Sequence, residues 1–267
     1  MKVAFWSEED GCGTTSSMAA VASVCSDAWK LKTVLLQSRS QSGDLKQKLE
    51  SGFKSSFVRE ETSYYALDGL DYLLWQEKNR KLNEQILQES MVPVVAGWMY
   101  YVPQGERRKP QIYSKELKEA MCNILAQVEK QSDLTFIDCG SGEDDLSAYL
   151  LQEADVVAVN FSQERQGLDS YFQQHHRYHG RVLYIINHYQ QESIYNKKNL
   201  NRIYRLQDSE LAVIPENPFF RNASDRGQIE RFIRRHIHYN LFDQQFYFMK
   251  ELMQTSLLLL KAAGLGG

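Results

Sequence analysis

The sequence has 267 residues, of which 43% are apolar and 24% charged, a composition that is ordinary for a globular protein and excludes a disordered chain. The formal net charge of −3 excludes a uniformly basic nucleic-acid binder and leaves room only for a local basic patch. No apolar run approaches the roughly 18 residues that a bilayer span requires, and acidic residues closely follow the short apolar start, so we expect no secretory signal, no transmembrane segment and a cytoplasmic protein.

The first 25 residues predict a strand, a glycine-containing loop and a helix. Residues 3–6 are apolar, residues 7–13 are small and turn-forming, and residues 14–25 are compatible with a helix. Such a unit directs backbone N–H groups and a helix N-terminus at one point, which suits a phosphate group. The loop nevertheless lacks the lysine of the pattern G-x-x-x-x-G-K-[ST], because Thr14 follows Gly13.

Apolar strands and helical segments alternate along the rest of the chain. After the first strand we expect strands at residues 32–37, 99–102, 133–139, 155–161, 181–187 and 211–215, with residues 94–98 as a loop. After the first helix we expect helices at residues 45–49, within 60–89 as two helices divided near Lys78, and at 114–130 with Ser114 as N-cap. Further helices are expected after the turn at 140–145 and at residues 166–175, 199–204, 226–238 and 242–260.

This alternation predicts an α/β fold, a three-layer sandwich with a mainly parallel sheet. Strands that are apolar on both faces and separated by helices form parallel sheets covered on both sides. The sequence contains no repeat and no low-complexity linker. We therefore expect residues 1–267 to form a single domain in which residues 240–267 are a C-terminal helix and tail.

Asp138 marks a second candidate for the site. It ends the strand at 133–139 and precedes a glycine-containing turn. Ligands of parallel sheets bind at the carboxyl ends of the strands, and P-loop proteins place an acidic side chain there, near a magnesium ion or its waters. The sequence therefore places Asp138 and the glycine loop at one site.

Together, these motifs resemble the ParA/MinD group of P-loop ATPases, whose phosphate loop has the form KGGxGKTT. The matching stretch is EDGCGTTS at residues 9–16. Further matches follow in the family's order, at VLLQSRSQSGD (34–44), LTFIDCGSG (134–142), ADVVAVNFSQ (154–163), VLYIINHYQ (182–190) and LAVIPENPFF (211–220). The resemblance implies a P-loop NTPase-like fold of the ParA/MinD type, a homodimer, and weak binding of ATP or ADP with Mg²⁺.

Carried over residue by residue, the resemblance also assigns the site. It implies that Thr15 is a magnesium ligand and that Asp138 interacts with the metal indirectly, through the groups that bind it. It also implies that Asn187 and Pro215 contact the base. It implies that the phosphates are held by Gly11, Cys12, Gly13, Thr14, Thr15 and Ser16.

The departures from the family pattern fall on the groups that hydrolyse ATP. Glu9 and Thr14 stand where the family has lysines, and Ser38 and Ser40 stand where its switch strand ends in aspartates. Losing one electrostatic donor of this kind costs about 3 kcal/mol of transition-state stabilisation. We therefore expect a pseudo-ATPase with no assigned catalytic residue. The alternative is an active ATPase whose missing lysines are replaced from elsewhere in the fold or from a partner. Arg39 is a candidate, although a solvated loop arginine is favoured there.

Within the family, the sequence is most similar to the atypical TadZ/CpaE-like branch. That resemblance implies a localisation or scaffold factor for Flp/Tad-type pilus or secretion assembly, with protein partners in a membrane-associated complex at the inner face of the membrane.

Other motifs have competing interpretations. A surface turn is favoured over a binding patch at residues 107–109, and a helix end over a metal site at the histidines 175, 176 and 179. The C-terminal helix has few basic residues, so packing on the domain or a partner is favoured over membrane docking. A solvated helix face is favoured over a DNA-binding partition module for Arg231, Arg234, Arg235 and His236.

The cysteines include no C-x-x-C pair, so we expect reduced thiols and no zinc framework. Cys12 lies in the glycine loop, where small filler is favoured over a reactive thiol.

Overall fold

A computed structural model describes residues 1–38, 44–50, 69–104, 110–142, 144–174 and 181–266. In this part of the chain, eight strands form one sheet in the order β3-β4-β2-β5-β1-β6-β7-β8. All neighbouring strands are parallel except β3 and β4. The strands are β1 (Lys2–Ser7), β2 (Thr33–Gln37), β3 (Val92–Val95), β4 (Met99–Tyr101), β5 (Leu134–Ser141), β6 (Val156–Ser162), β7 (Arg181–Tyr189) and β8 (Leu211–Pro215).

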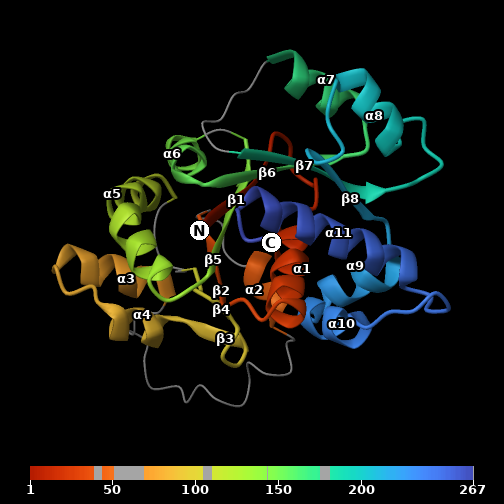
Figure 1. The fold of residues 1–267 in the computed structure, drawn as a ribbon. Coiled ribbons are helices and arrows are strands. Elements are labelled where there is room, and N and C mark those ends of the chain that lie inside the picture. Colours follow the sequence, from red (N-terminus) through yellow and green to blue (C-terminus); the bar gives the residue numbers. More distant parts are fainter. Residues whose placement is uncertain (39–43, 51–68, 105–109, 143, 175–180, 267) are drawn as a thin grey trace.

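Helices cover both faces of this sheet, so the predicted three-layer α/β architecture with a mainly parallel sheet is confirmed (Figure 1). One face carries α3 (Gly69–Lys78), α4 (Glu84–Ser90), α5 (Pro110–Glu129), α6 (Asp145–Glu153), α7 (Arg165–Gln174) and α8 (Lys197–Tyr204). The other face carries α1 (Thr14–Ala28), α2 (Asp44–Leu49), α9 (Pro218–Asp225), α10 (Ile229–His236) and α11 (Phe246–Ala262).

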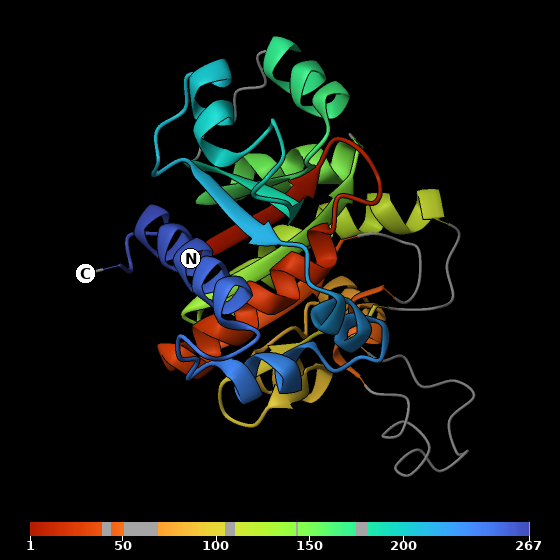
Figure 2. The same cartoon turned by 90° about the vertical axis from the view of Figure 1, so that its right-hand side faces the viewer.

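The central strands are buried because they are sandwiched between two apolar cores. Every residue of β2 and β8 is buried, as are residues 3–7 of β1. Helix α1 lies directly beneath the sheet and packs against α10 and α11 (Figure 2). Its buried Ala19, Ala20 and Ala22 suit this close packing, because alanine lets helices approach while costing little side-chain entropy.

The parallel register brings the carboxyl ends of the strands together. Phe5 of β1 pairs with Asp138 of β5, and Gln37 of β2 pairs with Asp138 from the other side. Farther along the sheet, Tyr189 of β7 pairs with Pro215 of β8. The loops that follow β1, β5, β7 and β8 therefore open at the same edge of the sheet, which is the edge where ligands of such folds bind.

Every strand predicted from the sequence is present, but two elements were missed. Residues 92–95 form the edge strand β3, part of which was predicted as a loop because of Gly97. The strand contains Pro93, and proline is tolerated on an edge strand. Helix α9 was also missed, although Asn217 caps it through a 2.9 Å hydrogen bond from the Phe220 N–H and Pro218 opens its first turn.

One helix start was wrong. Helix α5 begins at Pro110, so Ser114 lies inside it and is not its N-cap. Proline is favoured in a first helical turn because its missing N–H has no partner there in any case. The expectations for residues 60–68, Arg39, Ser40, the turn at 107–109 and the histidines 175, 176 and 179 fall outside the described residues.

No helix in the described ranges combines the length and the apolar character that crossing a bilayer would need.

Candidate functional site

Two glycines with left-handed backbone shape the loop between β1 and α1. Gly11 and Gly13 both lie in the left-handed region, with φ of 82° and 75°. Gly13 is also crowded, since a Cβ atom built on it would lie 3.3 Å from Nε2 of His188. Glycine at position 13 is therefore required both for its conformation and for the close approach of β7.

Side chains from neighbouring strands hold this loop in place. Ser7 Oγ donates to the Glu9 carbonyl at 2.9 Å, and Ser141 donates to the Asp10 carboxylate. The buried Asn187 donates through Nδ2 to the Cys12 carbonyl at 2.7 Å and to Asn160 Oδ1 at 2.9 Å. The loop is thus tied to β5 and β7 on its two sides.

Thr15 and Asp138 meet behind the loop. Thr15 Oγ1 donates to Asp138 Oδ2 at 2.7 Å, while Asp138 Oδ1 accepts the Gly140 N–H at 3.0 Å. Asp138 is only 1% exposed and Thr15 faces the cavity described below. One hydroxyl at the cavity wall with one carboxylate behind it fits Mg²⁺, which keeps several waters and few protein ligands.

A cavity of about 300 Å³ opens in front of the loop. This volume is at the lower end of the range typical of small-molecule sites. The first turn of α1, the ends of β7 and β8, and α9 all contribute to the wall. The wall includes every residue predicted to contact phosphate or base, namely Gly11, Cys12, Gly13, Thr14, Thr15, Ser16, Asn187 and Pro215.

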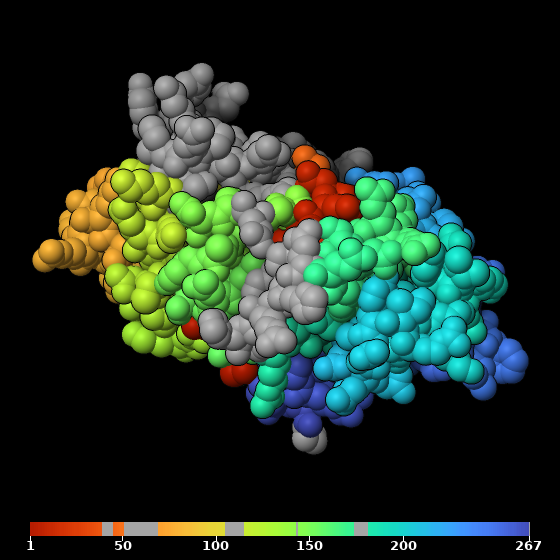
Figure 3. Space-filling view, turned by 90° about the horizontal axis from the view of Figure 1, so that it is seen from above, coloured from red at the N-terminus to blue at the C-terminus, as the bar shows by residue number. Residues whose placement is uncertain are grey.

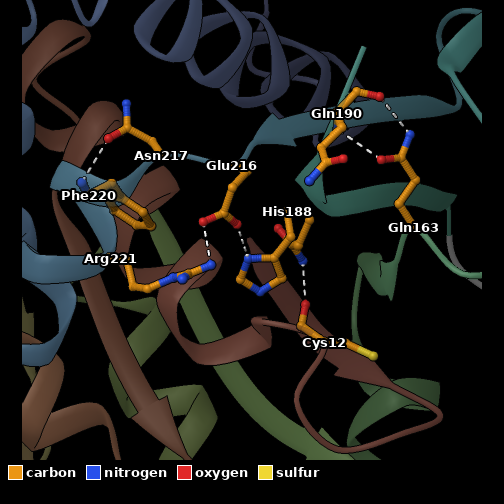
Figure 4. Close-up of polar contacts among 9 residues, drawn as sticks. Cys12, Gln163, His188, Gln190, Glu216, Asn217, Phe220 and Arg221 are labelled. Atoms are coloured by element: carbon orange, nitrogen blue, oxygen red, sulfur yellow. Dashed lines mark hydrogen bonds and ion pairs between the residues drawn. The ribbon is translucent and has the colours of Figure 1, made fainter. Parts of the chain in front are cut away.

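Six charged or ionisable residues of the wall were not predicted from the sequence, namely Asp10, Lys48, His188, Glu216, Arg221 and Asp225. His188 Nδ1 lies 2.8 Å from Glu216 Oε2, and Arg221 pairs with the other oxygen of the same carboxylate (Figure 4). Lys48 Nζ lies 3.6 Å from Asp225 Oδ1. His188 and Glu216 could have been found, because they directly follow the predicted residues Asn187 and Pro215. Arg221 could not be placed at the site from the sequence, because it lies on α9 and that helix was not predicted.

Comparisons with known proteins identify the fold. No protein-family model matches the sequence, and no curated protein matches it. A ParA family ATPase from Chlorobium tepidum matches the structure with a TM-score of 0.71 at 15% identity, covering 96% of this chain and 98% of that chain. The septum site-determining protein MinD of Pyrococcus horikoshii, in complex with Mg-ADP, matches with a TM-score of 0.64 at 14% identity, covering 100% and 99%. MinD in a MinC:MinD cell division complex from Aquifex aeolicus matches with a TM-score of 0.64 at 14% identity, covering 98% and 96%.

The chain has the ParA/MinD fold. Within this fold, Thr14 and Glu9 occupy the two positions where the resemblance expects lysines. Thr14 is buried and donates through Oγ1 to Ser7 Oγ at 3.1 Å. Glu9 lies over the first turn of α7, where a Cβ built on Gly167 would be 3.3 Å from its Oε2. A carboxylate is favoured there because the helix N-terminus carries partial positive charge.

The glycine loop is visible at the molecular surface beside α7 in the view from above, where the red atoms of the loop lie next to the green atoms of that helix (Figure 3). Glu8 contributes to this contact by accepting a hydrogen bond from Ser170 Oγ at 3.1 Å. Ser38 is buried and donates to the Asp138 carbonyl at 3.1 Å. In the ParA/MinD fold of this chain, Glu8 therefore ties the loop to α7, and Ser38 ties the end of β2 to β5.

The remaining predicted features lie away from the cavity. Arg234 pairs with Glu230 at 3.2 Å and His236 with Asp243 at 3.5 Å, whereas Arg231 and Arg235 are exposed. Helix α11 packs its apolar face on α1, β7 and β8.

All four cysteines are free thiols. Cys12 is buried at the loop. Burial raises the pKa of Cys139, and the Asp138 and Asp144 carboxylates raise it further, so this thiol stays protonated.

Proposed function

We propose that this protein binds ATP or ADP with Mg²⁺ in the cavity in front of the glycine loop, and acts as a localisation or scaffold factor with little or no ATP hydrolysis. The observation that carries the proposal is the 2.7 Å Thr15–Asp138 hydrogen bond behind a loop whose lysine positions are Thr14 and Glu9. The frame for binding is present, and the cations that assist phosphoryl transfer are replaced.

Binding is supported by the arrangement of the loop. The first turn of α1 lines the cavity with Thr14, Thr15 and Ser16, so its backbone N–H groups and the positive end of the helix dipole serve phosphate oxygens. Thr15 and Asp138 would hold the metal ion, which when bound neutralises phosphate charge. The MinD neighbour in complex with Mg-ADP supports the same ligand class. Asn187 and Pro215 are proposed to contact the base from the ends of β7 and β8.

Weak hydrolysis is supported by the charges around the cavity. Among its described lining residues, both permanently cationic side chains are paired, Lys48 with Asp225 and Arg221 with Glu216. Because each is held by a carboxylate, neither Lys48 nor Arg221 takes the place of the two lysines that would contact the transferred phosphate. Each missing electrostatic donor costs on the order of 3 kcal/mol, a factor of a hundred or more in rate.

The cellular role is supported by resemblance alone. The resemblance to the ParA/MinD group favours a homodimer. The resemblance to the TadZ/CpaE-like branch favours a role in positioning a Flp/Tad-type pilus or secretion complex at the inner face of the membrane. The MinC:MinD neighbour, in which a protein of this fold binds a protein partner, supports a scaffold of that kind.

Calorimetry with Mg-ATP and Mg-ADP, together with a phosphate-release assay, tests the proposal. We expect both nucleotides to bind and hydrolysis to stay at background. Thr14→Lys should raise nucleotide affinity at least tenfold, about 1.4 kcal/mol, because it adds a charge-assisted contact at the loop, and it should leave turnover at background. If the wild-type protein binds no nucleotide, the binding proposal is wrong. Robust turnover that Asp138→Ala abolishes would instead establish an active ATPase.

A DNA-binding partition module is the second candidate, favoured only by the exposed Arg231 and Arg235 on α10. A gel shift tests it, since phosphate contacts require an affinity that falls steeply with added salt. Binding that is insensitive to salt, or no binding, would exclude this use of α10.

A further inference from the structure

The end of β7 presents a histidine to the phosphate loop. His188 lies within β7, yet its backbone is in the left-handed region, with φ of 52°. The β7–β8 register also shifts between Ile186 and Tyr189. Non-glycine residues seldom adopt this conformation, and those that do often lie at binding sites. Here the irregularity accompanies a side chain that lines the cavity.

The two ring nitrogens of His188 face different groups. Nδ1 lies 2.8 Å from the Glu216 carboxylate, which Arg221 holds from the other side (Figure 4). Nε2 faces the glycine loop, since a Cβ built on Gly13 would lie 3.3 Å from it. The ring is therefore oriented by a carboxylate and directed at the position where the proposed function places phosphate.

This geometry couples phosphate binding to a proton. A neutral imidazole has one N–H donor, and the Glu216 carboxylate requires that donor on Nδ1. Nε2 would then present a lone pair to the phosphate oxygens, which is repulsive. Protonation makes both nitrogens donors and adds a positive charge next to the loop.

Charged groups from several elements line the same cavity wall as His188. Glu216 lies at the end of β8, Asp10 in the loop and Asp225 on α9, while the cations of the same described wall are Arg221 on α9 and Lys48 on α2. Carboxylates thus exceed permanent cations by one. That excess leaves the cavity short of the positive charge that a phosphate needs.

We infer that His188 is the proton-dependent phosphate ligand of this site, taking up a proton when an anionic ligand binds and donating Nε2–H to it. The inference rests on the proposed function and adds to it, because His188 then supplies the cation that the loop sequence lacks. Nucleotide binding should therefore depend on pH and be tighter on the acidic side of neutrality, because histidine is the side chain whose charge changes in that range.

Calorimetry of the full chain with Mg-ADP, at pH 6 to 8 in buffers of different ionisation enthalpy, measures the protons taken up on binding. His188→Asn is the test variant, because asparagine tolerates left-handed backbone and carries no titrating group. His188→Gln, which also keeps an amide donor, is a second variant should the first fold poorly. His238→Gln is the matched control, since this exposed histidine lies outside the cavity wall.

We expect the wild-type protein and His238→Gln to take up several tenths of a proton more than His188→Asn around pH 7. Their affinity should also fall about tenfold more between pH 6 and pH 8 than that of His188→Asn. The titration of ADP itself is common to all samples and cancels. Equal proton uptake and equal pH profiles in the wild type and both His188 variants would overturn the inference while leaving the proposed function intact. Absence of nucleotide binding by the wild type would overturn both.

Discussion

Thr15 and Asp138 are 123 positions apart in the sequence, and a 2.7 Å hydrogen bond joins them behind the phosphate loop. The bond links the first turn of α1 to the end of β5, the two central elements of the site. Because Asp138 also accepts the Gly140 N–H, its carboxylate fixes both the loop and the turn after β5. Asparagine at this position would remove the charge and one of the two acceptor oxygens.

Asp138→Asn is expected to remove the magnesium dependence of nucleotide binding. The side-chain amide keeps an acceptor for Thr15 but lacks the negative charge that favours a divalent cation behind the hydroxyl. Calorimetric titration with ADP in the presence and absence of Mg²⁺ measures this dependence. Asp144→Asn is the control, because Asp144 is an N-cap of α6 outside the cavity wall. A variant Asp138→Asn that still binds more tightly with Mg²⁺ would show that this carboxylate does not serve the metal.

Gly13→Ala and Gly11→Ala form a matched pair. Both glycines have positive φ, so each substitution is expected to destabilise the fold by about 1–2 kcal/mol, measured by urea unfolding. Only Gly13 is crowded, with a built Cβ 3.3 Å from His188 Nε2, whereas that of Gly11 meets nothing within 4 Å. Gly13→Ala should therefore also lower ADP affinity by displacing His188. Equal losses of affinity in the two variants would contradict the close approach of β7.

Asp169 on α7 predicts a specific dependence of stability on acid. Hydrogen bonds from Tyr204 at 2.8 Å and from Arg165 at 2.9 Å hold the pKa of this carboxyl below its usual value. The folded-state pKa is thus lower than the unfolded one, so the stabilisation is present above about pH 4 and is lost as the pH falls through the folded-state value.

Asp169→Asn should accordingly lower stability at pH 7 and flatten the fall of stability below about pH 4. Urea unfolding at a series of pH values measures both effects. Asp208→Asn, at an exposed carboxylate of the loop before β8, is the control. If Asp169→Asn leaves the acid limb unchanged, the Tyr204 and Arg165 contacts do not persist in solution.

Much of the architecture was predictable because the residue types within each segment determine whether it forms a buried strand, a helix or a loop. Buried parallel strands are apolar on both faces, so the interior strands of the sheet could be predicted from apolar runs. The loop before α1 could be predicted from its small, turn-forming residues. The edge strand β3 and helix α9 were missed because each begins with proline or has it near its start, and Pro93 and Pro218 are compatible with either a loop or an element end. Only pairing with β4, and packing beside α2 and α10, distinguishes the alternatives.

The sequence by itself determined the glycine loop, the strand that ends in Asp138, and the replacement of the expected lysines by Glu9 and Thr14. These are matters of residue type and order. Only the tertiary structure decided where Glu9 lies, against α7, and which residues face the loop, because those contacts join strands that are far apart in the chain. The placement of His188 between Glu216 and Gly13 belongs to this second class. It depends on the register of β7 against β8 and on a single backbone torsion, neither of which the local sequence specifies.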